Sequence, residues 1–269
     1  MLIRRRLISI DVTKGSFSQI VTAIMELAVK RESSYVCVAN VHMLLESHYS
    51  SAFKDVVNGA NIVTADGMPL AKSFKLLYGE QQERVDGMNL LPALLKESVR
   101  SSSSVFFYGG KQGMLETTEK YLKETYPDLI VAGTYSPPFR ELTDEEYIDT
   151  AKMITASGAN IVFVVLGCPK QEIWMAKMKG KIPAVMIGIG GALPVMVGLQ
   201  LRAPNWMQRN SLEWSFRLMQ EPRRLFKRYF KTNSHFIYLI TKERFKRKNA
   251  SLEDKEARLG SNYNPVDPT

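Results

Sequence analysis

Several polar residues follow directly after short apolar runs of the chain, and their types could do chemistry. Asp66, with Gly67 beside it, comes after the β-rich residues 61–64. A carboxylate at this place could act as a general base or hold the hydroxyls of a ribose. The simpler interpretation is a helix N-cap, because an Asp before a helix commonly accepts hydrogen bonds from backbone N–H groups. Position alone favours the cap and leaves catalysis open.

The segment Gly167-Cys168-Pro169-Lys170-Gln171-Glu172 is harder to explain as a plain turn. Pro169 can open a helix in its first turn, which would place Gln171 and Glu172 at the N-terminal end, facing a crevice. The Gln171 amide offers both a donor and an acceptor, as the edge of a nucleobase requires. Cys168 could be a nucleophile, but no histidine is placed to activate it. A partly buried structural thiol is therefore the better interpretation.

Two glycine turns also follow apolar runs, Gly109-Gly110 and Gly188-Ile189-Gly190-Gly191. Glycine lets a backbone approach a phosphate closely, and the helix N-terminus that follows favours anions. The alternative is a tight turn that binds nothing. Neither turn ends in the Lys-Ser/Thr of a Walker A loop, and Leu193 replaces the last glycine of a complete dinucleotide fingerprint.

The segment Arg84-Val85-Asp86-Gly87-Met88-Asn89 offers a cation next to hydrogen-bonding side chains. Arg84 could pair with a diphosphate, and Asp86 or Asn89 could meet sugar hydroxyls. Read alone, a surface arginine followed by a helix cap is the simpler interpretation.

The elements that must position these residues are short β-rich runs and longer windows with apolar residues every three or four positions. Strands are expected at residues 35–39, 61–64, 104–108, 129–133, 160–166 and 184–187. Helices are expected at residues 16–30, 41–58, 87–99, 112–125, 143–156 and 170–179. This alternation predicts an α/β fold with an open, mostly parallel, Rossmann-like sheet and helices on both faces.

In such a sheet, ligands bind beyond the carboxyl ends of the strands. The residues that follow the expected strands should therefore surround one crevice. They are Asn40, Asp66, Gly109, Tyr135, Gly167 and Gly188.

The charge of the chain is concentrated near its C-terminus. Residues 201–250 hold 13 Lys/Arg against 3 Asp/Glu, whereas residues 1–200 hold 21 against 20. We therefore expect an α/β catalytic domain over residues 1–198, a basic helical appendage over 199–249 and a disordered tail over 250–269. Cations interleaved with aromatic residues are typical of a helix that lies on an anionic membrane surface. A helix that packs on its own domain is the plain alternative, and nucleic-acid binding is disfavoured because the cations are confined to the appendage.

The remaining composition excludes several classes of protein. Two cysteines and three histidines provide neither a disulfide scaffold nor the spacing of a metal site, so we expect no metal. No apolar run approaches the roughly 20 residues that span a bilayer, and the N-terminus lacks the apolar stretch of a signal peptide. The expected location is the cytoplasm.

Five stretches in register resemble the WecG/TagA/CpsF family of bacterial glycosyltransferases, glycosyltransferase family 26. Together they lie within roughly residues 35–230. They are Val63-Thr64-Ala65-Asp66-Gly67-Met68-Pro69, Arg84-Val85-Asp86-Gly87-Met88-Asn89-Leu90, Gly167-Cys168-Pro169-Lys170-Gln171-Glu172, Gly188-Ile189-Gly190-Gly191-Ala192, and residues 202–224 with Arg202-Ala203-Pro204-Asn205-Trp206 and Gln220-Glu221-Pro222-Arg223-Arg224. The chain departs from the family in keeping only the Asn of Thr-x-Asn, at Asn40, and in having Leu193-Pro194 where many members have Phe-Asp. The resemblance is thus to a subgroup.

The resemblance implies an inverting, metal-independent transfer of a sugar from a nucleotide sugar that is usually UDP-linked. The implied acceptor is a polyprenyl-diphosphate-linked saccharide at the inner face of the cytoplasmic membrane, where the enzyme would be a peripheral protein. The products would be surface polysaccharides such as exopolysaccharide, capsule, common antigen or teichoic acid. A homo-oligomer would also be compatible with this role.

The resemblance also implies roles for single residues. Asp66 matches the base that deprotonates the acceptor, and Arg84 matches an arginine at the diphosphate. Gln171 and Tyr135 match positions of the uracil pocket. The other expected contacts with substrate or nucleotide are Asn40, Gly109, Gly167, Glu172, Gly188 and Gly190. The expected contacts with the lipid diphosphate and the membrane are Arg217, Arg223, Arg224 and Arg228.

Two other functions stay open on the sequence alone. A non-catalytic nucleotide-binding module could use the basic appendage to dock on anionic lipid or nucleic acid. An NAD-dependent enzyme is the weaker alternative, because the glycine fingerprint is incomplete and lacks its acid about 20 residues further on.

Overall fold

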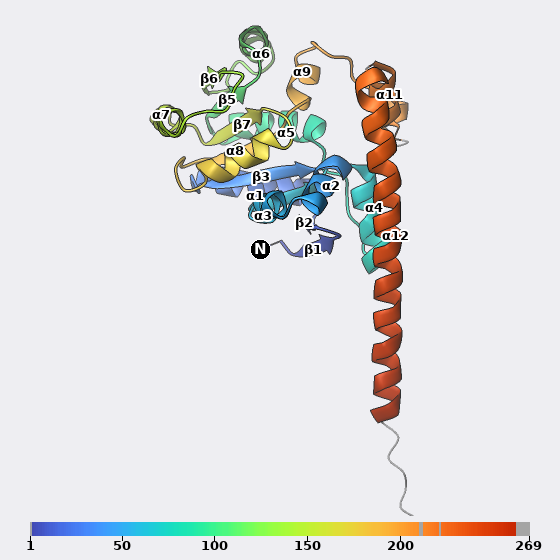
Figure 1. Ribbon diagram of the computed structural model, residues 1–269. Helices are drawn as coiled ribbons and strands as arrows, with labels where there is room; N and C mark the ends of the chain where they lie inside the picture. Colours follow the sequence, from blue (N-terminus) through green and yellow to red (C-terminus); the bar gives the residue numbers. More distant parts are fainter. Residues whose placement is uncertain (1, 210–211, 221, 262–269) are drawn as a thin grey trace, which may run out of the picture.

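The computed structural model describes residues 2–209, 212–220 and 222–261 of the chain. Its centre is a six-stranded sheet, parallel throughout, with the strand order β4-β3-β8-β7-β5-β6 (Figure 1). The strands are β3 (Ser34–Ala39), β4 (Ile62–Ala65), β5 (Val105–Gly109), β6 (Val131–Tyr135), β7 (Ile161–Val165) and β8 (Val185–Gly188). All six expected strands and the α/β fold class are confirmed.

Helices cover both faces of this sheet, as expected. One face packs on α2 (Val41–Tyr49), α3 (Ser51–Asn58), α4 (Met68–Tyr78), α7 (Asp144–Ala156) and α8 (Lys170–Met178). The other face packs on α1 (Phe17–Val29), α5 (Gly87–Arg100), α6 (Gln112–Thr125) and α9 (Ala192–Met196). Strand β3 is buried along its whole length, with Tyr35 and Cys37 in the first core and Val36 and Val38 in the second. A strand buried on both faces reads as an unbroken apolar run, which is why the sequence revealed it.

The structure differs from the expected elements in three places. The helix expected over 41–58 is broken at Ser50, whose hydroxyl accepts a hydrogen bond from the backbone N–H of Phe53 at 3.2 Å and so begins α3. The expected elements also omitted α4, α9 and an antiparallel hairpin of β1 (Arg4–Leu7) and β2 (Ile10–Thr13). Three consecutive arginines leave β1 without the apolar pattern that predicts a strand. In the structure, Arg4 donates a hydrogen bond to the backbone carbonyl of Asn58 at 3.1 Å, which helps to hold the hairpin on the body.

The sheet changes its winding direction between β3 and β8. The chain leaves β3 and forms β4 on one side, while β8 pairs with the other side of β3. Such a reversal opens a crevice at the carboxyl ends of the two central strands. Asn40 after β3 and Gly190 after β8 therefore lie at the same edge of the sheet.

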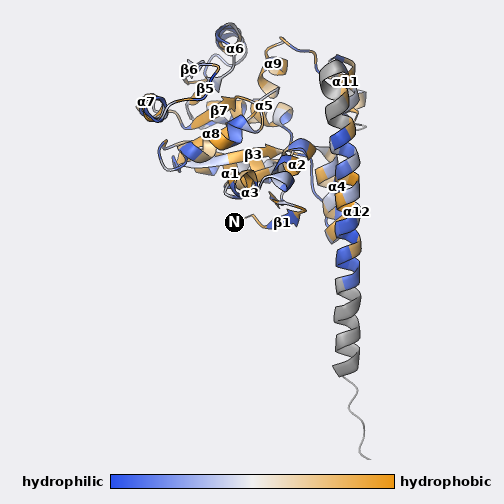
Figure 2. Ribbon diagram, in the orientation of Figure 1, coloured by the Kyte–Doolittle hydropathy of each residue, from blue (hydrophilic) through white to orange (hydrophobic). Residues whose placement is uncertain are grey.

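The C-terminal segment is helical, with α10 (Asn205–Arg209), α11 (Glu213–Gln220) and the long α12 (Pro222–Ser261). Helix α12 runs along the side of the body and continues well beyond it (Figure 1). It packs against α2 and α4 through Phe236, Leu239 and Ile240, which are buried. Hydrophilic residues predominate along the rest of the coloured part of α12 (Figure 2). Within the described chain, not one helix has the length and apolar composition needed to cross a membrane.

The expected disorder over 250–269 differs from the structure, because α12 continues through Ser261. Residues 251–259 contain Leu, Glu, Lys, Ala and Arg, which are strong helix formers and favour continuation of the helix. The last eight residues lie outside the described part of the chain, and the division into domains stays a prediction.

We predict that Leu239→Ala weakens the docking of α12 by about 2–4 kcal/mol, because it removes a buried side chain from the interface with the body. Phe245→Ala is the matched control in the same helix, since Phe245 is exposed, and its effect should stay within about 0.5 kcal/mol. Hydrogen exchange of α12 together with urea unfolding measures both effects. Equal protection of α12 in the two variants would contradict the packing described here.

Candidate functional site

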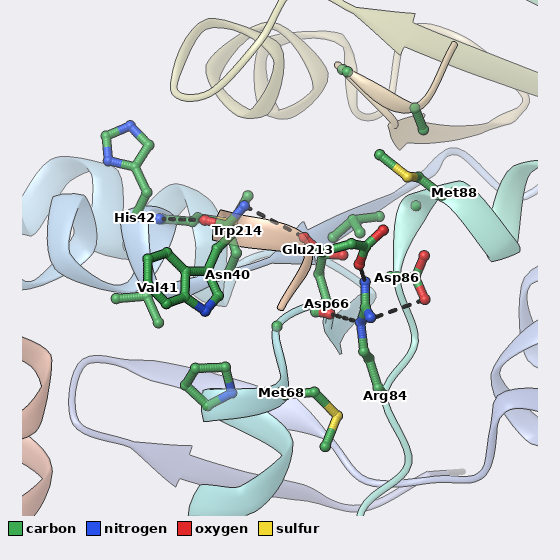
Figure 3. A pocket seen from close by; sticks show the side chains of 18 of the residues that line it. Asn40, Val41, His42, Asp66, Met68, Arg84, Asp86, Met88, Glu213 and Trp214 are labelled. Carbon is green, nitrogen blue, oxygen red and sulfur yellow. Dashed lines mark hydrogen bonds and ion pairs between the residues drawn. The ribbon is translucent and has the colours of Figure 1, made fainter. Parts of the chain in front are cut away.

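A cavity of about 500 Å³ lies at the carboxyl edge of the sheet, beside the β3–β8 reversal (Figure 3). Its walls come from residues at or after the ends of four strands, β3, β4, β7 and β8, from the loop that holds Arg84, and from the C-terminal helices. The expected site residues that line it are Asn40, Asp66, Arg84, Gln171, Gly188 and Gly190. The structure therefore brings together six residues that lie far apart in the sequence.

Asp66 lies directly after β4 and is held against the end of β3. Its backbone N–H donates to the carbonyl of Ala39 at 2.9 Å, and the Asn40 side-chain amide lies 3.5 Å from Asp66 Oδ2. The helix that follows has Gly67 as its N-cap, with no side-chain hydrogen bond at the cap. The interpretation of Asp66 as a helix cap is therefore wrong. Its carboxylate faces the cavity, where a proton acceptor could act on a bound hydroxyl (Figure 3).

Arg84 lies beside Asp66, with only 19% of its side chain exposed. Its Nε donates to the backbone carbonyl of Asp66 at 2.8 Å and lies 3.6 Å from Asp86 Oδ2. Its other end forms an ion pair with Glu213 of α11 (Figure 3). Burial disfavours the charged guanidinium, but the carboxylates of Asp86, Glu213 and Asp66 outweigh that effect and raise the pKa of Arg84. A fixed, fully charged guanidinium at a cavity is well suited to bind phosphate oxygens.

Asp86 has the capping role that its position suggested. It is the N-cap of α5, and its carboxylate accepts from the backbone N–H of Asn89 at 3.1 Å and from the Asn89 side chain at 2.7 Å. Asp86 is almost fully buried, so its main function is to hold Arg84 and the start of α5 in place.

Gln171 lies in the first turn of α8 and lines the cavity next to two glycines after β8. A Cβ atom at Gly188 would lie 2.7 Å from Gln171 Nε2, and one at Gly190 would lie 3.3 Å from Gln171 Oε1. These glycines are thus needed for the close approach of the bare backbone to the amide.

Glu172 was expected to face the crevice, but it does not. Its side chain is fully buried behind the cavity, where it accepts a hydrogen bond from Gln171 Nε2 at 2.7 Å. Successive residues of a helix point about 100° apart, and here Gln171 points to the cavity while Glu172 points into the protein interior. Burial raises the pKa of Glu172 to about 7, despite the stabilising hydrogen bond from Gln171.

Three other expected residues lie outside the cavity lining. Gly109 and Tyr135 end β5 and β6, on the far half of the sheet, and Tyr135 stacks on Tyr108 with ring centroids 5.9 Å apart. Gly167 is nearer, and its backbone N–H donates to Gln171 Oε1 at 3.2 Å. Cys168 is partly buried, in agreement with a structural thiol. The nucleotide-binding roles of Gly109, Gly167 and Tyr135 stay predictions.

The four arginines expected at the lipid diphosphate cannot be placed by their side chains. The backbone of Arg217 lies in α11, and the backbones of Arg223, Arg224 and Arg228 lie in α12. All four side chains lie outside the described residues. Their roles stay predictions.

The C-terminal helices also supply cavity residues that the sequence did not reveal. Glu213 and Trp214 come from α11, and Thr232, Asn233 and Phe236 come from α12. The family resemblance over residues 202–224 marked this region, but no local pattern shows that Glu213 meets an arginine 129 residues away in the sequence. The appendage is therefore a wall of the site as well as a basic extension.

Comparison with known proteins assigns this architecture to a family. The model of the glycosyl transferase WecG/TagA/CpsF family matches residues 5–250, which is nearly the whole chain. The chain belongs to the WecG/TagA/CpsF family. It is therefore an enzyme of the glycosyl transferase class, which removes the non-catalytic module and the NAD-dependent enzyme as alternatives.

Two curated relatives of this glycosyl transferase come from Bacillus. One, from Bacillus spizizenii, is 31% identical over 196 residues, which cover 72% of this chain and 74% of that protein. The other, from Bacillus subtilis, is 30% identical over 194 residues, which cover 72% and 73%. Both are named N-acetylglucosaminyldiphosphoundecaprenol N-acetyl-β-D-mannosaminyltransferase.

Metal-binding side chains do not gather in the described part of this glycosyl transferase. No group of three or more His, Cys, Asp or Glu residues there is arranged to hold a metal ion. Independence from metal stays a prediction that the transfer assay below tests directly.

We predict that Glu172→Gln makes the stability of the protein less dependent on pH. The raised pKa of Glu172 means that the folded protein binds its proton more tightly than the unfolded chain does. The stability contributed by this group is therefore present below about pH 4.5 and lost as the pH rises to about 7. Urea unfolding at pH 5 and pH 8 should show that the wild type loses about 2 kcal/mol more than the variant over this range. Equal losses would show that Glu172 does not titrate in this way.

Proposed function

We propose that this glycosyl transferase moves an N-acetylhexosamine from a UDP-linked donor to a saccharide carried on polyprenyl diphosphate. The observation that carries the proposal is the position of a carboxylate and a guanidinium, Asp66 and Arg84, at one cavity of a family member. The names of the two Bacillus relatives support an acceptor linked to undecaprenyl diphosphate and make N-acetylmannosamine the first sugar to test.

In the proposed reaction, an acceptor hydroxyl attacks the anomeric carbon of the donor from the face opposite the UDP group. The new bond joins the acceptor oxygen to the anomeric carbon, and the bond from that carbon to the β-phosphate oxygen breaks. Asp66 takes the proton of the hydroxyl, and UDP leaves with the bonding electron pair. A single displacement inverts the anomeric centre, which agrees with the β linkage in the relatives' names if the donor is α-linked.

Arg84 is the cation that would meet the charge developing on UDP. Its side chain is held in place by the carbonyl of Asp66 and by two carboxylates, so little reorganisation is needed when the phosphate arrives. The ion pair with Glu213 lies on the same guanidinium, so a bound diphosphate would share Arg84 with Glu213 or displace it.

The uracil base would be read by Gln171, whose amide has a donor and an acceptor beside Gly188 and Gly190. Tyr135, Gly109 and Gly167 would extend this region along the carboxyl edge of the sheet. Asn40, 3.5 Å from Asp66, would orient the base or a sugar hydroxyl.

We further propose that the enzyme is peripheral on the inner face of the cytoplasmic membrane. Support comes from the cluster of exposed cations on α12 and from the lipid-linked acceptor of the relatives. In this arrangement Arg217, Arg223, Arg224 and Arg228, which precede the cavity residues of α12 in the sequence, would contact the acceptor diphosphate.

We predict that Asp66→Asn lowers turnover by at least about a hundredfold, because the amide cannot take the acceptor's proton. The assay measures transfer from UDP-N-acetylmannosamine to a polyprenyl-diphosphate-linked N-acetylglucosamine, with and without EDTA. The control is Asp55→Asn, which changes an exposed acid of α3 and should keep wild-type turnover. Near wild-type turnover of Asp66→Asn, with its fold intact by circular dichroism, would refute Asp66 as the base. Loss of wild-type activity in EDTA would refute metal independence.

We predict that reversing the charges of Lys242, Arg244 and Lys246 together lowers binding to anionic liposomes by at least about tenfold. Each basic residue near an anionic surface contributes about 1 kcal/mol, and all three side chains are exposed on α12. Co-sedimentation with phosphatidylglycerol vesicles measures the effect, and neutral phosphatidylcholine vesicles show the background.

The matched control reverses Lys111, Lys120 and Lys123, which are exposed on or next to α6 of the body. This variant has the same net charge as the first. Equal losses in the two variants would mean that total charge, and not the appendage, governs binding to the membrane.

A further inference from the structure

Glu172 is a buried carboxylate that the proposed chemistry does not use. It lies in the first turn of α8 with none of its surface exposed, and the Cys168 thiol, a weak donor, is its other neighbour beside Gln171 while its Oε2 makes no regular hydrogen bond among the described residues. Burying an incompletely paired carboxylate is unfavourable, because its hydration is lost. The free-energy cost of burying this carboxylate calls for a functional reason.

The contact of Glu172 with Gln171 provides that reason. Gln171 Nε2 donates to Glu172 Oε1 at 2.7 Å, and Gln171 Oε1 accepts from the backbone N–H of Gly167 at 3.2 Å. An ionised carboxylate can only accept, and a backbone N–H can only donate. The two partners therefore allow a single orientation of the Gln171 amide.

Two glycines at and just after the end of β8, Gly188 and Gly190, restrict the position of this amide further. Nε2 would lie 2.7 Å from a Cβ atom at Gly188, and Oε1 would lie 3.3 Å from one at Gly190. The amide thus packs edge-on against bare backbone at the cavity wall. Its second N–H and the second lone pair of its oxygen are the groups left to meet a ligand.

We propose that Glu172 is a positioning residue that fixes which end of the Gln171 amide donates and which accepts, and so sets recognition of the nucleobase of the donor. This inference rests on the proposed function, because it requires that Gln171 contacts the base. An amide free to turn over would present the wrong partner to each polar group of the base for part of the time.

Protonation of Glu172 would release this constraint. A protonated carboxyl can donate as well as accept, so it no longer selects one end of the Gln171 amide, and only the 3.2 Å contact with the Gly167 backbone N–H still favours the original orientation. The titratable groups that face Glu172 are the thiols of Cys168 and of Cys37 on β3, and Glu46 of α2 lies near Cys168. Burial raises the pKa of both thiols, so they stay neutral while Glu172 titrates.

The test compares Glu172→Gln with the wild type in the transfer assay and in calorimetric binding of UDP. Glutamine has nearly the same shape but can donate and accept, so it removes the constraint that Glu172 places on the Gln171 amide and leaves only the contact with the Gly167 backbone N–H. We expect KM for the UDP-sugar and Kd for UDP to rise about tenfold at pH 8, the effect of about one hydrogen bond, with kcat within about twofold. Wild-type KM should rise as the pH falls from 8 to 6, and this dependence should be absent in Glu172→Gln.

Two further variants show whether the effect passes through Gln171. In a Gln171→Ala background, Glu172→Gln should change KM no further, because the group that it positions is gone. Glu145→Gln, an exposed acid of α7, should leave KM and its pH dependence unchanged. A loss of melting temperature without a change in KM would show a purely structural role and overturn the proposal.

The outcomes also separate this inference from the proposed function. No transfer and no UDP binding by the wild type would refute the proposed function itself. Normal wild-type activity with the same KM and pH profile in Glu172→Gln would leave the function standing and overturn the role of Glu172. Additive effects of the Gln171 and Glu172 substitutions would likewise overturn it.

Discussion

The pairing of β3 with β8 is the constraint on which the site depends. Their register joins Ser34 to Val185 and Cys37 to Gly188, although 151 residues separate the strands. This pairing sets Asn40 beside the glycine turn after β8, and the pairing of β3 with β4 adds Asp66 on the other side. The half of the cavity that holds Asp66 and the half that holds Gly188 and Gly190 therefore lie on opposite sides of β3.

Charge in the site is organised around a single guanidinium. Arg84 contacts the carboxylates of Asp86 and of Glu213, which belongs to the C-terminal helices, and it donates to the backbone carbonyl of Asp66. These contacts keep a buried cation charged and fixed in direction without filling the cavity. They also make the appendage part of the electrostatics of the body, because one of the carboxylates belongs to α11.

Much of the fold could be predicted from the sequence, because the central strands are buried on both faces and read as apolar runs. The sites at strand ends followed from the general geometry of parallel sheets. Asp66 was harder to interpret, because an Asp before a helix suggests a cap and only the structure shows that Gly67 takes that role. The role of Glu172 could not be predicted, since the sequence does not show which way each residue of a helix's first turn points.

Contacts between distant segments were beyond prediction for a different reason. The pair of Arg84 and Glu213, and the cavity wall formed by Phe236, depend on how α11 and α12 return to the body. No local pattern in a basic helix specifies which of its turns will dock. The same limit explains the β1–β2 hairpin, in which Arg4 donates to the backbone carbonyls of Asn58 and Asn61 and Arg5 pairs with Glu80.

In the proposed membrane-bound arrangement, helix α12 would set the height of the cavity above the lipid. Phe236 forms part of the cavity wall, and the exposed Lys246 lies ten residues further along the same helix, a rise of about 15 Å. If those cations rest on lipid headgroups, the cavity stands no more than about that height above the bilayer surface. A lipid-anchored acceptor must bridge this gap with its diphosphate and sugar alone. The height would thus select short lipid-linked saccharides whose reactive hydroxyl lies within reach, and longer chains would carry that hydroxyl past the cavity.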